Sequence, residues 1–356
     1  MRTNNVIVNQ VGLINSSREY RRYDNYYLSN YYENSNFNYK KDNYLSNVCY
    51  MNSSIQCLFH LNDFVHFILN SPGKPLVNST RNLLINMINS KQEKYKNNLS
   101  VEEIKMEMGR IDDRYNHNRQ EDANEFISNF LDALREETSV KYNKNGTNSF
   151  KGDLENEAYK KFEKKFYERR GDSSLLDLFY GNYITEKFCK KCRKKISVQF
   201  SAFNMIELPI YELAQENKYS SLNIKQILDS YFAESKIYES FCDKCYGDIY
   251  CKTSIYKLPE NLIIFFGRTA NDQYISNNID YSQTLDLDDY LYDKNNTNKN
   301  NYKLSGIIQY IYFGKKFGHY TASCQCNDGW YHFDDAMVTK GQNHSNEIIL
   351  FYENRI

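Results

Sequence analysis

The sequence predicts an α+β protein, and two features of the 356-residue chain support this class. Helical periodicity is concentrated before residue 180, where apolar residues recur at the spacing of one helix face. After residue 180 the pattern changes to short apolar runs typical of strands. Helices followed by strands favour α+β over an alternating α/β sheet, and no internal repeat is visible.

The first helix is expected to begin next to Cys49. Met51, Ile55, Leu58 and Phe59 follow it at positions that share one helix face. This pattern predicts a helix that packs one apolar side against the core.

Two further helices are predicted. The stretch QEDANEFISNFLDALREE has negative charge in its first turn, which the helix dipole favours. Its apolar stripe consists of Ala123, Phe126, Ile127, Phe130, Leu131 and Leu134. A charged helix from Glu155 to Arg170 is expected to bury Tyr159, Phe162 and Phe166.

The second part of the chain predicts a series of strands. They are expected at residues 196–200, 210–214, 254–258, 261–266, 304–313, 319–326, 330–333 and 348–352. Between them, Asn271 to Asn301 is rich in Asn and Asp and is expected to form a loop-bearing insertion.

Charge and hydropathy exclude several classes of protein. Lys and Arg number 45, as do Asp and Glu, so the net charge of zero gives no basis for binding nucleic acid or an anionic membrane. No apolar run approaches the length of a membrane span. The opening residues MRTNNVIVNQ lack the apolar region of a signal peptide, so we expect a cytosolic or nuclear protein. The nine cysteines are then expected to serve metal binding or catalysis rather than disulfides.

Four of these cysteines form two CxxC pairs, Cys189 with Cys192 and Cys242 with Cys245. Two intervening residues let both thiolates of a pair face one ion, and two pairs complete a tetrahedral shell. Neither pair lies beside a βαβ unit, so zinc is favoured over a redox motif and over unrelated cysteines. Because the shell is closed, we expect a structural zinc with no part in chemistry.

A reactive thiol and a distant histidine are the other candidates. Cys49 stands at a helix N-terminus, where the dipole makes a thiol easier to ionise. His319 opens a strand after a glycine-bearing loop, and a hairpin would bring the following Asp334 and Asp335 beside it. Taken singly, Cys49 and His319 are better explained as buried structural residues.

Taken together, the motifs resemble those of the ubiquitin-specific proteases, papain-like cysteine peptidases that remove ubiquitin. The cysteine box is NVCYMNSSIQCL, and the histidine box is FGHYTAS followed by WYHFDDAMVT. Between them lie QEDANEFISNFLDALREE, FYGNYITEKFCKKC, LPI and CDKC with KLPENLIIF, and ILFY follows near the C-terminus. The blocks keep the family's order and cover about residue 41 to 356.

The resemblance implies roles for particular residues. Cys49 would be the nucleophile, His319 the general base, Asp334 the carboxylate that orients it, and Asp335 an auxiliary acidic position. The implied residues of the channel for the ubiquitin tail are Gln120, Asp122, Glu125 and Gly318. Carboxylates suit this channel because the tail carries arginines before its Gly-Gly end. Capping of a first helical turn also explains Asp122 and Glu125, and both explanations can hold together.

The resemblance also implies the domain organisation. A helical thumb would span about 41–175, zinc-tipped β fingers about 176–255 and a β-rich palm about 256–356. Residues 1–40 are dominated by Asn, Tyr, Ser and Arg without helical or strand period, and we expect a low-complexity, mobile extension.

The chain departs from the family pattern just before Cys49. The family has an Asn five residues ahead of the nucleophile, whose amide helps to form the oxyanion hole, and here that position is Tyr44. Ser46 and Val48 replace the usual Gly and Thr. Backbone N–H groups or the Tyr44 hydroxyl could compensate, or Tyr44 could simply pack its ring against the first helix. Loss of one oxyanion donor costs about 10²–10³ in rate.

Three hypotheses about function arise from these observations. The leading hypothesis is a thiol-dependent deubiquitinase that acts on ubiquitin conjugates as a monomer. The alternatives are a weak or inactive ubiquitin-binding module of the same fold, and a protease for another ubiquitin-like modifier.

Overall fold

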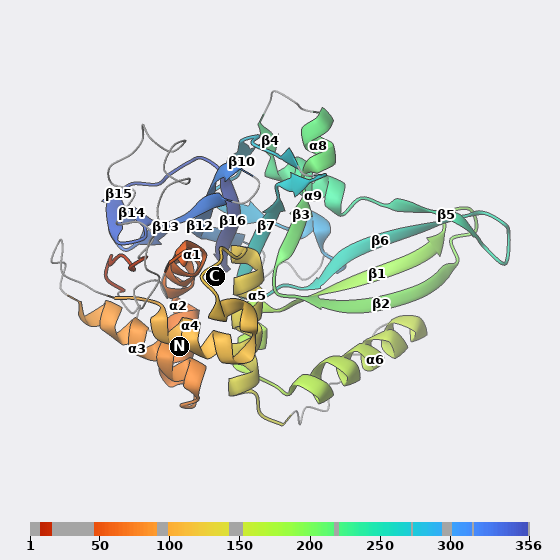
Figure 1. Ribbon diagram of the computed structural model, residues 1–356. Coiled ribbons are helices and arrows are strands. Elements are labelled where there is room, and N and C mark those ends of the chain that lie inside the picture. Colours follow the sequence, from red (N-terminus) through yellow and green to blue (C-terminus); the bar gives the residue numbers. More distant parts are fainter. Residues whose placement is uncertain are drawn as a thin grey trace. The chain divides into compact units, whose positions relative to one another are not determined.

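The chain folds into two compact units, and its computed structural model describes most of the residues of both (Figure 1). The described residues are 8–15, 46–90, 99–141, 152–216, 221–271, 273–293, 301–314 and 317–354. The first unit comprises 1–137 and 305–345, and the second comprises 138–304 and 346–356. Helices come first and strands dominate after residue 180, which confirms the α+β class. The division into thumb, fingers and palm stays a prediction.

The first unit combines helices with an antiparallel sheet. Its helices are α1 (Cys49–Phe59), α2 (Asn62–Asn70), α3 (Pro75–Asn89), α4 (Glu102–Ile111), the 3-10 turn η2 (Asp113–Asn116) and α5 (Ala123–Thr138). Its strands are β12 (Asn301–Gly314, from Ser305 onward), β13 (Phe317–Cys326), β14 (Gly329–Asp334) and β15 (Met337–Lys340). These strands lie in the order β15-β14-β13-β12, and each neighbouring pair is antiparallel.

Helix α1 forms the centre of the first unit and packs against β13. The sequence predicts one apolar face, yet all residues of this helix are buried. Its polar side chains are accommodated because they donate to backbone carbonyls. Ser54 Oγ bonds the Tyr50 oxygen at 2.6 Å, and Gln56 Nε2 bonds the Val11 oxygen at 2.6 Å. The helix is therefore buried along its whole length, including Cys49 at its N-terminus.

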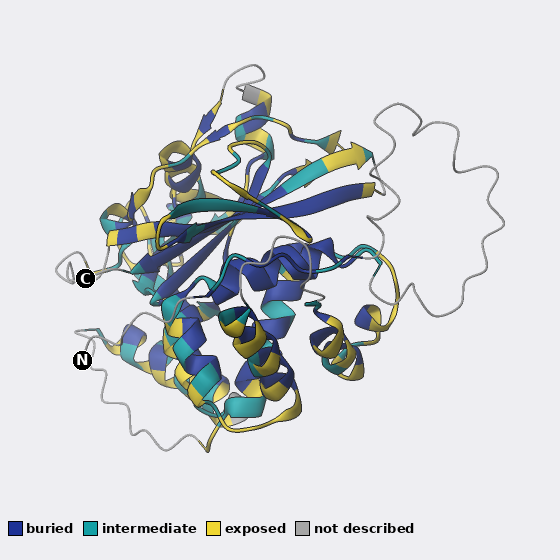
Figure 2. Ribbon diagram, turned by 90° about the vertical axis from the view of Figure 1, so that its left-hand side faces the viewer, coloured by how far each residue is buried: buried dark blue, intermediate teal, exposed yellow. Residues whose placement is uncertain are grey.

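Helix α5 confirms the predicted apolar stripe, since all six stripe residues are buried. Phe126 is its central contact. Its ring stacks on Phe130 at 5.4 Å and meets the edges of Tyr50 and Tyr115 at 5.6 and 5.8 Å. Such aromatic contacts stabilise beyond the area they bury, so Phe126 links α5 firmly to α1. Figure 2 shows the general pattern, with buried residues on inner helix faces and along the strands.

Residues 8–15 form no helix or strand, but Val8, Val11, Leu13 and Asn15 are buried. The expectation of a mobile extension is therefore wrong for this segment. Its polar groups are paired with groups far away in the sequence, such as the Asn9 amide with the Ile88 and Ser90 carbonyls at 2.7 Å. Residues 1–7 and 16–45 lie outside the described residues.

The second unit holds a long four-stranded antiparallel sheet, ordered β2-β1-β6-β5. These strands are β1 (Gly181–Cys189), β2 (Lys195–Phe203), β5 (Ser235–Phe241) and β6 (Asp248–Lys257). Helix α6 (Asp153–Arg170) runs along one face of this sheet (Figure 1). As expected, the helix buries Tyr159 and Phe166, and Tyr159 packs with Ile184 and Phe200 of the sheet.

The rest of the second unit is built from shorter elements. In this unit, β16 (Glu347–Asn354) pairs antiparallel with β7 (Asn261–Gly267), and β7 pairs parallel with β3 (Ile206–Pro209). The other elements are α7 (Ser174–Phe179), α8 (Tyr211–Glu216), β4 (Leu222–Asn223), α9 (Ile224–Tyr231), β8 (Thr269–Ala270), β9 (Gln273–Tyr274), β10 (Ile279–Asp280), β11 (Thr284–Asp286) and the 3-10 turn η3 (Asp288–Tyr290).

Two expectations from the sequence differ from this structure. The strand predicted at 210–214 is wrong, because Tyr211–Glu216 forms α8. Its Glu, Leu, Ala and Gln are good helix formers, and an apolar run of five residues does not distinguish strand from helix. In the insertion from Asn271 to Asn301, the described residues 271 and 273–293 contain the short β9, β10 and β11 and the turn η3 besides irregular stretches.

No helix in the part of the chain that the structure describes is long and apolar enough to cross a membrane.

A carboxylate from α5 caps the start of α3, and this contact gives a test of the fold. Both oxygens of Glu137 accept backbone N–H bonds, from Leu76 at 3.1 Å and Val77 at 3.0 Å. Glu137→Ala leaves these donors without their acceptor, so we expect the free energy of unfolding to fall by about 1 kcal/mol or more. Urea denaturation measures the change. The neighbouring Glu136→Ala removes an exposed carboxylate and is the matched control. Equal losses in both variants would contradict the capping role.

Candidate active site

Cys49 is the first residue of α1 and is buried. The chain enters the helix through Asn47, whose φ of 60° turns the backbone sharply before Val48. The Asn47 amide donates to the Asn118 carbonyl at 2.8 Å, which fixes this turn. The Cys49 thiol lies close enough to the imidazole of His319 to raise its pKa. The local fold thus places a thiol at the start of a helix beside the imidazole.

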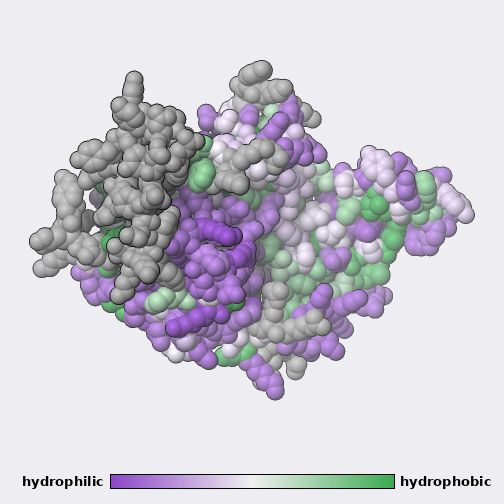
Figure 3. Space-filling model, viewed as in Figure 1, coloured by the Kyte–Doolittle hydropathy of each residue, from purple (hydrophilic) through white to green (hydrophobic). Residues whose placement is uncertain are grey.

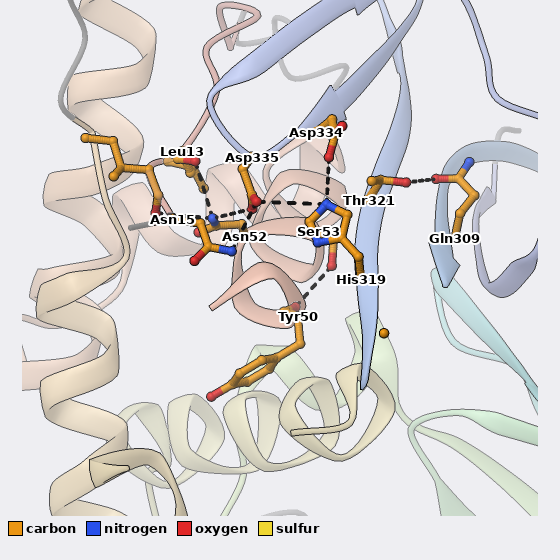
Figure 4. A network of polar contacts seen from close by, with 12 residues as sticks. Leu13, Asn15, Tyr50, Asn52, Ser53, Gln309, His319, Thr321, Asp334 and Asp335 are labelled. Atoms are coloured by element: carbon orange, nitrogen blue, oxygen red, sulfur yellow. Dashed lines mark hydrogen bonds and ion pairs between the residues drawn. The ribbon is translucent and has the colours of Figure 1, made fainter. Parts of the chain in front are cut away.

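His319 lies on β13 and is buried. The antiparallel hairpin of β13 and β14 brings Asp334, the last residue of β14, to the imidazole. His319 Nε2 and Asp334 Oδ1 are 2.7 Å apart (Figure 4). Nε2 is thus engaged by the carboxylate.

The surroundings of His319 favour its protonated form. Burial lowers its pKa, but the hydrogen bond with Asp334 and the neighbouring Cys49 and Asp335 raise it more, to about 9. The imidazole is therefore largely a cation at neutral pH.

Asp335 lies in the turn after β14, with a φ of 52° and a buried side chain. Its Oδ2 lies 3.9 Å from His319 Nε2, farther than Asp334. The Asn52 amide donates to Oδ1 at 2.9 Å, and the Asn15 amide donates to Oδ2 at 3.1 Å (Figure 4). Two amide donors satisfy this buried charge without transferring a proton.

The spacing of His319, Asp334 and Asp335 would also permit a metal ion, since their ligand atoms lie within 4.8 Å of one another. The observed contacts fit proton handling better. One carboxylate is bonded to the imidazole, and the other accepts two amides.

Gln120 fixes the backbone immediately before His319. Its Nε2 donates to the Gly318 carbonyl at 2.6 Å, and its Oε1 accepts the Gly318 N–H at 3.0 Å. A side chain at Gly318 would place its Cβ about 2.1 Å from the Tyr310 ring, so this position requires glycine. The two hydrogen bonds from Gln120 and the absence of a side chain at Gly318 together fix the backbone position of His319.

The two carboxylates predicted to line the channel have partners in the structure. Asp122 accepts a hydrogen bond from the Tyr320 hydroxyl at 3.2 Å. Glu125 forms an ion pair with Arg114 at 2.6 Å, and both of these side chains are about half exposed. Figure 3 shows a predominantly hydrophilic surface over the helices of this unit.

In the second unit the four cysteines of the CxxC pairs converge, with all sulfurs within 4.8 Å of one another. Cys189 ends β1 and Cys242 follows β5, so two adjacent turns supply the cluster. Cys189 Sγ is 3.4 Å from Cys245 Sγ, and Cys192 Sγ is 3.7 Å from Cys242 Sγ.

The backbone of this cluster favours thiolates. The Cys192 N–H is the largest influence on Cys189 and lowers its pKa to about 7. The Gly247 N–H lowers the pKa of Cys245, but burial and the neighbouring cysteines raise it to about 11. Several thiolates this close together repel one another, and a metal cation would relieve that repulsion. The cluster is able to hold a metal ion.

All nine cysteines are free. The structure brings together Cys49, His319, Asp334 and Asp335, with Gln120 and Gly318 beside them. It also adds two amides that the sequence did not single out. Asn52 lies one turn after Cys49, and that helical spacing could have indicated it. Asn15 had no such local signal, and Tyr44 lies outside the described residues.

Comparisons with known proteins agree on one family. The family model described as "Ubiquitin carboxyl-terminal hydrolase" matches residues 42–352. Ubiquitin carboxyl-terminal hydrolase Usp2 of Drosophila melanogaster is 26% identical over 328 residues, covering 87% of this chain and 34% of that protein. Ubiquitin carboxyl-terminal hydrolase 4 of Vanderwaltozyma polyspora is 25% identical over 369 residues, covering 86% of this chain and 40% of that protein. The chain thus spans between about a third and two fifths of the length of these relatives.

Solved structures share the fold. A SAGA DUB module of Ubp8, Sgf11, Sus1 and Sgf73 bound to monoubiquitin matches with a TM-score of 0.67 and 17% identity, covering 100% of this chain and 71% of that chain. The same kind of module bound to ubiquitin aldehyde matches with a TM-score of 0.63 and 18% identity, covering 87% and 68%.

The raised pKa of His319 predicts how pH acts on this site. Asp334→Asn removes a charge that favours the imidazolium, so we expect the pKa of His319 to fall from about 9 by about one unit or more. The reactivity of Cys49 toward iodoacetamide reports this shift, because its pH profile follows the thiol–imidazole pair. Asp328→Asn changes an exposed aspartate in the β13–β14 turn and is the matched control.

The same shift has a consequence for stability. Since the folded-state pKa lies above 6.5, the imidazolium's contribution is fully present below about pH 6.5 and is lost as pH rises through about 9. Asp334→Asn should flatten this dependence in melting experiments. A pH profile of alkylation identical to that of the unaltered chain would contradict the assignment.

Proposed function

Because the chain belongs to the ubiquitin carboxyl-terminal hydrolase family, we propose that it is a cysteine-type deubiquitinase. It cleaves the bond after the C-terminal glycine of ubiquitin in conjugates. The observation that supports this most directly is one imidazole, His319, that is bonded to the Asp334 carboxylate and lies beside the Cys49 thiol. That is the arrangement a thiol hydrolase needs.

In the proposed reaction, the Cys49 thiolate attacks the carbonyl carbon of the terminal glycine, and the carbonyl electrons move onto its oxygen. The tetrahedral intermediate collapses as the bond to the departing amine breaks, and His319 gives that amine its proton. The now neutral His319 takes a proton from water, which attacks the thioester. The ubiquitin carboxylate leaves, and the thiol is restored.

The raised pKa of His319 supports its role as the proton donor to the departing amine. An imidazolium that persists to about pH 9 can protonate the departing amine at neutral pH. Asp334 keeps the ring in one orientation through both proton transfers, and Asp335 acts as an auxiliary acidic position.

We assign the approach of the ubiquitin tail to Gln120, Asp122, Glu125 and Gly318. Gln120 and Gly318 hold the backbone beside His319, so an extended tail would pass close to them. The Glu125–Arg114 pair is half exposed, so an arginine of the tail could replace Arg114 as its partner. Asp122 would contribute with its second oxygen while the first accepts the Tyr320 hydroxyl.

For the four-cysteine cluster we propose a structural zinc ion held by Cys189, Cys192, Cys242 and Cys245. Zinc–sulfur bonds of about 2.3 Å in a tetrahedron separate the sulfurs by roughly 3.8 Å, close to the distances in this cluster. Glycine at position 247 leaves room for the sulfurs, because a Cβ there would lie 3.0 Å from Cys189 Sγ and 3.3 Å from Cys245 Sγ. The ion would clamp two turns and leave no position for a substrate.

Ubiquitin and ubiquitinated proteins are the proposed partners, and the cytosol or nucleus is the proposed location. The free cysteines support a reducing compartment. The monomeric state expected from the sequence stays a prediction. The solved Ubp8 modules also contain Sgf11, Sus1 and Sgf73. Light scattering of the purified chain would measure its mass and so show whether it is a monomer on its own.

A ubiquitin probe with a C-terminal propargyl group tests the activity. We expect covalent labelling of the full chain, because the Cys49 thiolate adds to the alkyne held where the glycine carbonyl would lie. Cys49→Ser should abolish labelling. Cys57→Ser alters another buried cysteine of the same helix and should label normally. Reversible ubiquitin binding without labelling would favour the inactive binding module. Labelling only by a probe built on another ubiquitin-like modifier would show that this modifier, and not ubiquitin, is the substrate.

Metal analysis tests the cysteine cluster. We expect one zinc per chain, and Cys242→Ser should lose the metal, lower the melting temperature and weaken ubiquitin binding. Alkylation of Cys49 should stay unchanged, because none of the four cysteines belongs to the unit that contains Cys49. Cys251→Ser, a half-buried free cysteine outside the cluster, is the control. A chain that binds no zinc yet melts identically before and after Cys242→Ser would refute the site.

A further inference from the structure

Lys105 on α4 is fully buried, which is rare for a lysine. Removal of the ammonium from water lowers its pKa to about 8, so its burial costs free energy that an apolar residue would not lose. Its Nζ donates to Asn118 Oδ1 at 3.0 Å. The side chain thus brings a buried charge to one residue of the segment between η2 and α5.

Asn118 belongs to residues 116–120, here called the bridging loop. The loop is tied to α4 at a second point, where Asn116 Nδ2 donates to the Gly109 carbonyl at 2.8 Å. At Gly109 a Cβ would lie 2.1 Å from Asn116 Oδ1, so the absence of a side chain leaves room for this amide. Helix α4 therefore holds the loop through Asn116 and, by way of Lys105, through Asn118.

The same loop bonds the backbone next to both reacting groups. The Asn118 carbonyl accepts the Asn47 amide at 2.8 Å, and Asn47 forms the sharp turn two residues before the reactive thiol. Gln120 bonds both backbone groups of Gly318, the residue before the imidazole. One short stretch of chain thus sets the backbone on the thiol side and on the imidazole side of the candidate active site.

The proposed reaction depends on how closely Cys49 and His319 approach each other. A displacement of about 1 Å among reacting groups can cost about 10²-fold in rate, even when its cause lies far from the chemistry. Residues 117–122 form no helix or strand, so their position depends on bonds such as the one from Lys105.

We propose that Lys105 is a positioning residue for the reaction: by holding Asn118 it fixes the bridging loop, and the loop fixes Cys49 relative to His319. This inference rests on the proposed function. The role of Lys105 is indirect, and the Asn118 side chain transmits it. The acceptor that the ammonium reaches, rather than packing, then explains why a lysine occupies a buried position.

Lys105→Met keeps an apolar side chain of similar length and removes the ammonium. In the full chain we expect kcat on a ubiquitin–fluorophore substrate to fall about 10- to 100-fold, with a smaller change in KM. The pH profile of Cys49 alkylation by iodoacetamide should also change. Cys49 is one of the groups that raise the pKa of His319 to about 9, so that pKa should fall when the two groups move apart. A purely structural lysine would leave this profile unchanged in the folded variant.

Variants of Asn118 test the path from the lysine to the site. Asn118→Leu removes the acceptor at an exposed residue and should reproduce both effects. Asn118→Asp keeps an acceptor oxygen opposite the ammonium and should restore most of the kcat lost in Asn118→Leu. Lys105→Met combined with Asn118→Leu should lose no more than either variant alone, because both break the same bond. Additive losses would overturn the path through Asn118.

Arg110→Met is the matched control. It removes an exposed cation of the same helix, which pairs with Glu107, and should alter neither kcat nor the alkylation profile. Melting temperatures show which variants fold, and if Lys105→Met folds poorly, Asn118→Leu carries the test.

Two further outcomes separate this inference from the proposed function. Full hydrolysis with an unaltered alkylation profile, in folded Lys105→Met or Asn118→Leu, would overturn the inference alone. If the unaltered chain hydrolyses no ubiquitin substrate while Lys105→Met still changes the alkylation profile, the proposed function is overturned and the positioning of Cys49 and His319 by Lys105 stands.

Discussion

The buried carboxylate of Asp335 organises the first unit. A buried charge must be matched by donors, and here they come from separate parts of the chain. Asn52 approaches from α1 and Asn15 from residues 8–15, while the backbone carbonyl of the same aspartate accepts from the Leu13 N–H. Helix α1 cannot shift along β13 without breaking one of these bonds. The position of Cys49 relative to His319 therefore depends on how this neighbouring charge is satisfied.

The two neighbouring carboxylates, Asp334 and Asp335, have different surroundings. Asp334 is partly exposed and bonded directly to the imidazole, so it can respond as the ring gains and loses its proton. Asp335 is enclosed and held by two amides, so its position is fixed. The two adjacent aspartates, one at the end of β14 and one in the turn after it, thereby differ in exposure and in hydrogen-bond partners.

Much of this could be read from the sequence. The stripe of α5 and the inner face of α6 show helical periodicity. The α5 stripe, Tyr159 and Phe166 are buried as expected, and Phe162 is partly buried. The Cys49, His319 and Asp334 group was indicated by motif order, and the two CxxC pairs by their spacing. The enclosure of α1 was not predictable, because Gln56 and Asn52 are buried through bonds to the distant carbonyls of Val11 and Leu13. The prediction of a mobile extension failed at residues 8–15 for the same reason, since local composition does not reveal partners hundreds of residues away.

The discontinuity of the first unit bears on how the protein is made. Asn15 and Asp335 are 320 residues apart in sequence, and most of the second unit is synthesised between them. A ribosome would release Cys49 long before His319 and the β14 turn exist, so during synthesis the thiol has no base to activate it. Contacts of such long range also slow folding, although each doubling of loop length costs only about 0.6 kcal/mol. Chemical competence would then arise as one of the last events of folding, and a chain terminated early would remain an inert thiol rather than an unregulated protease.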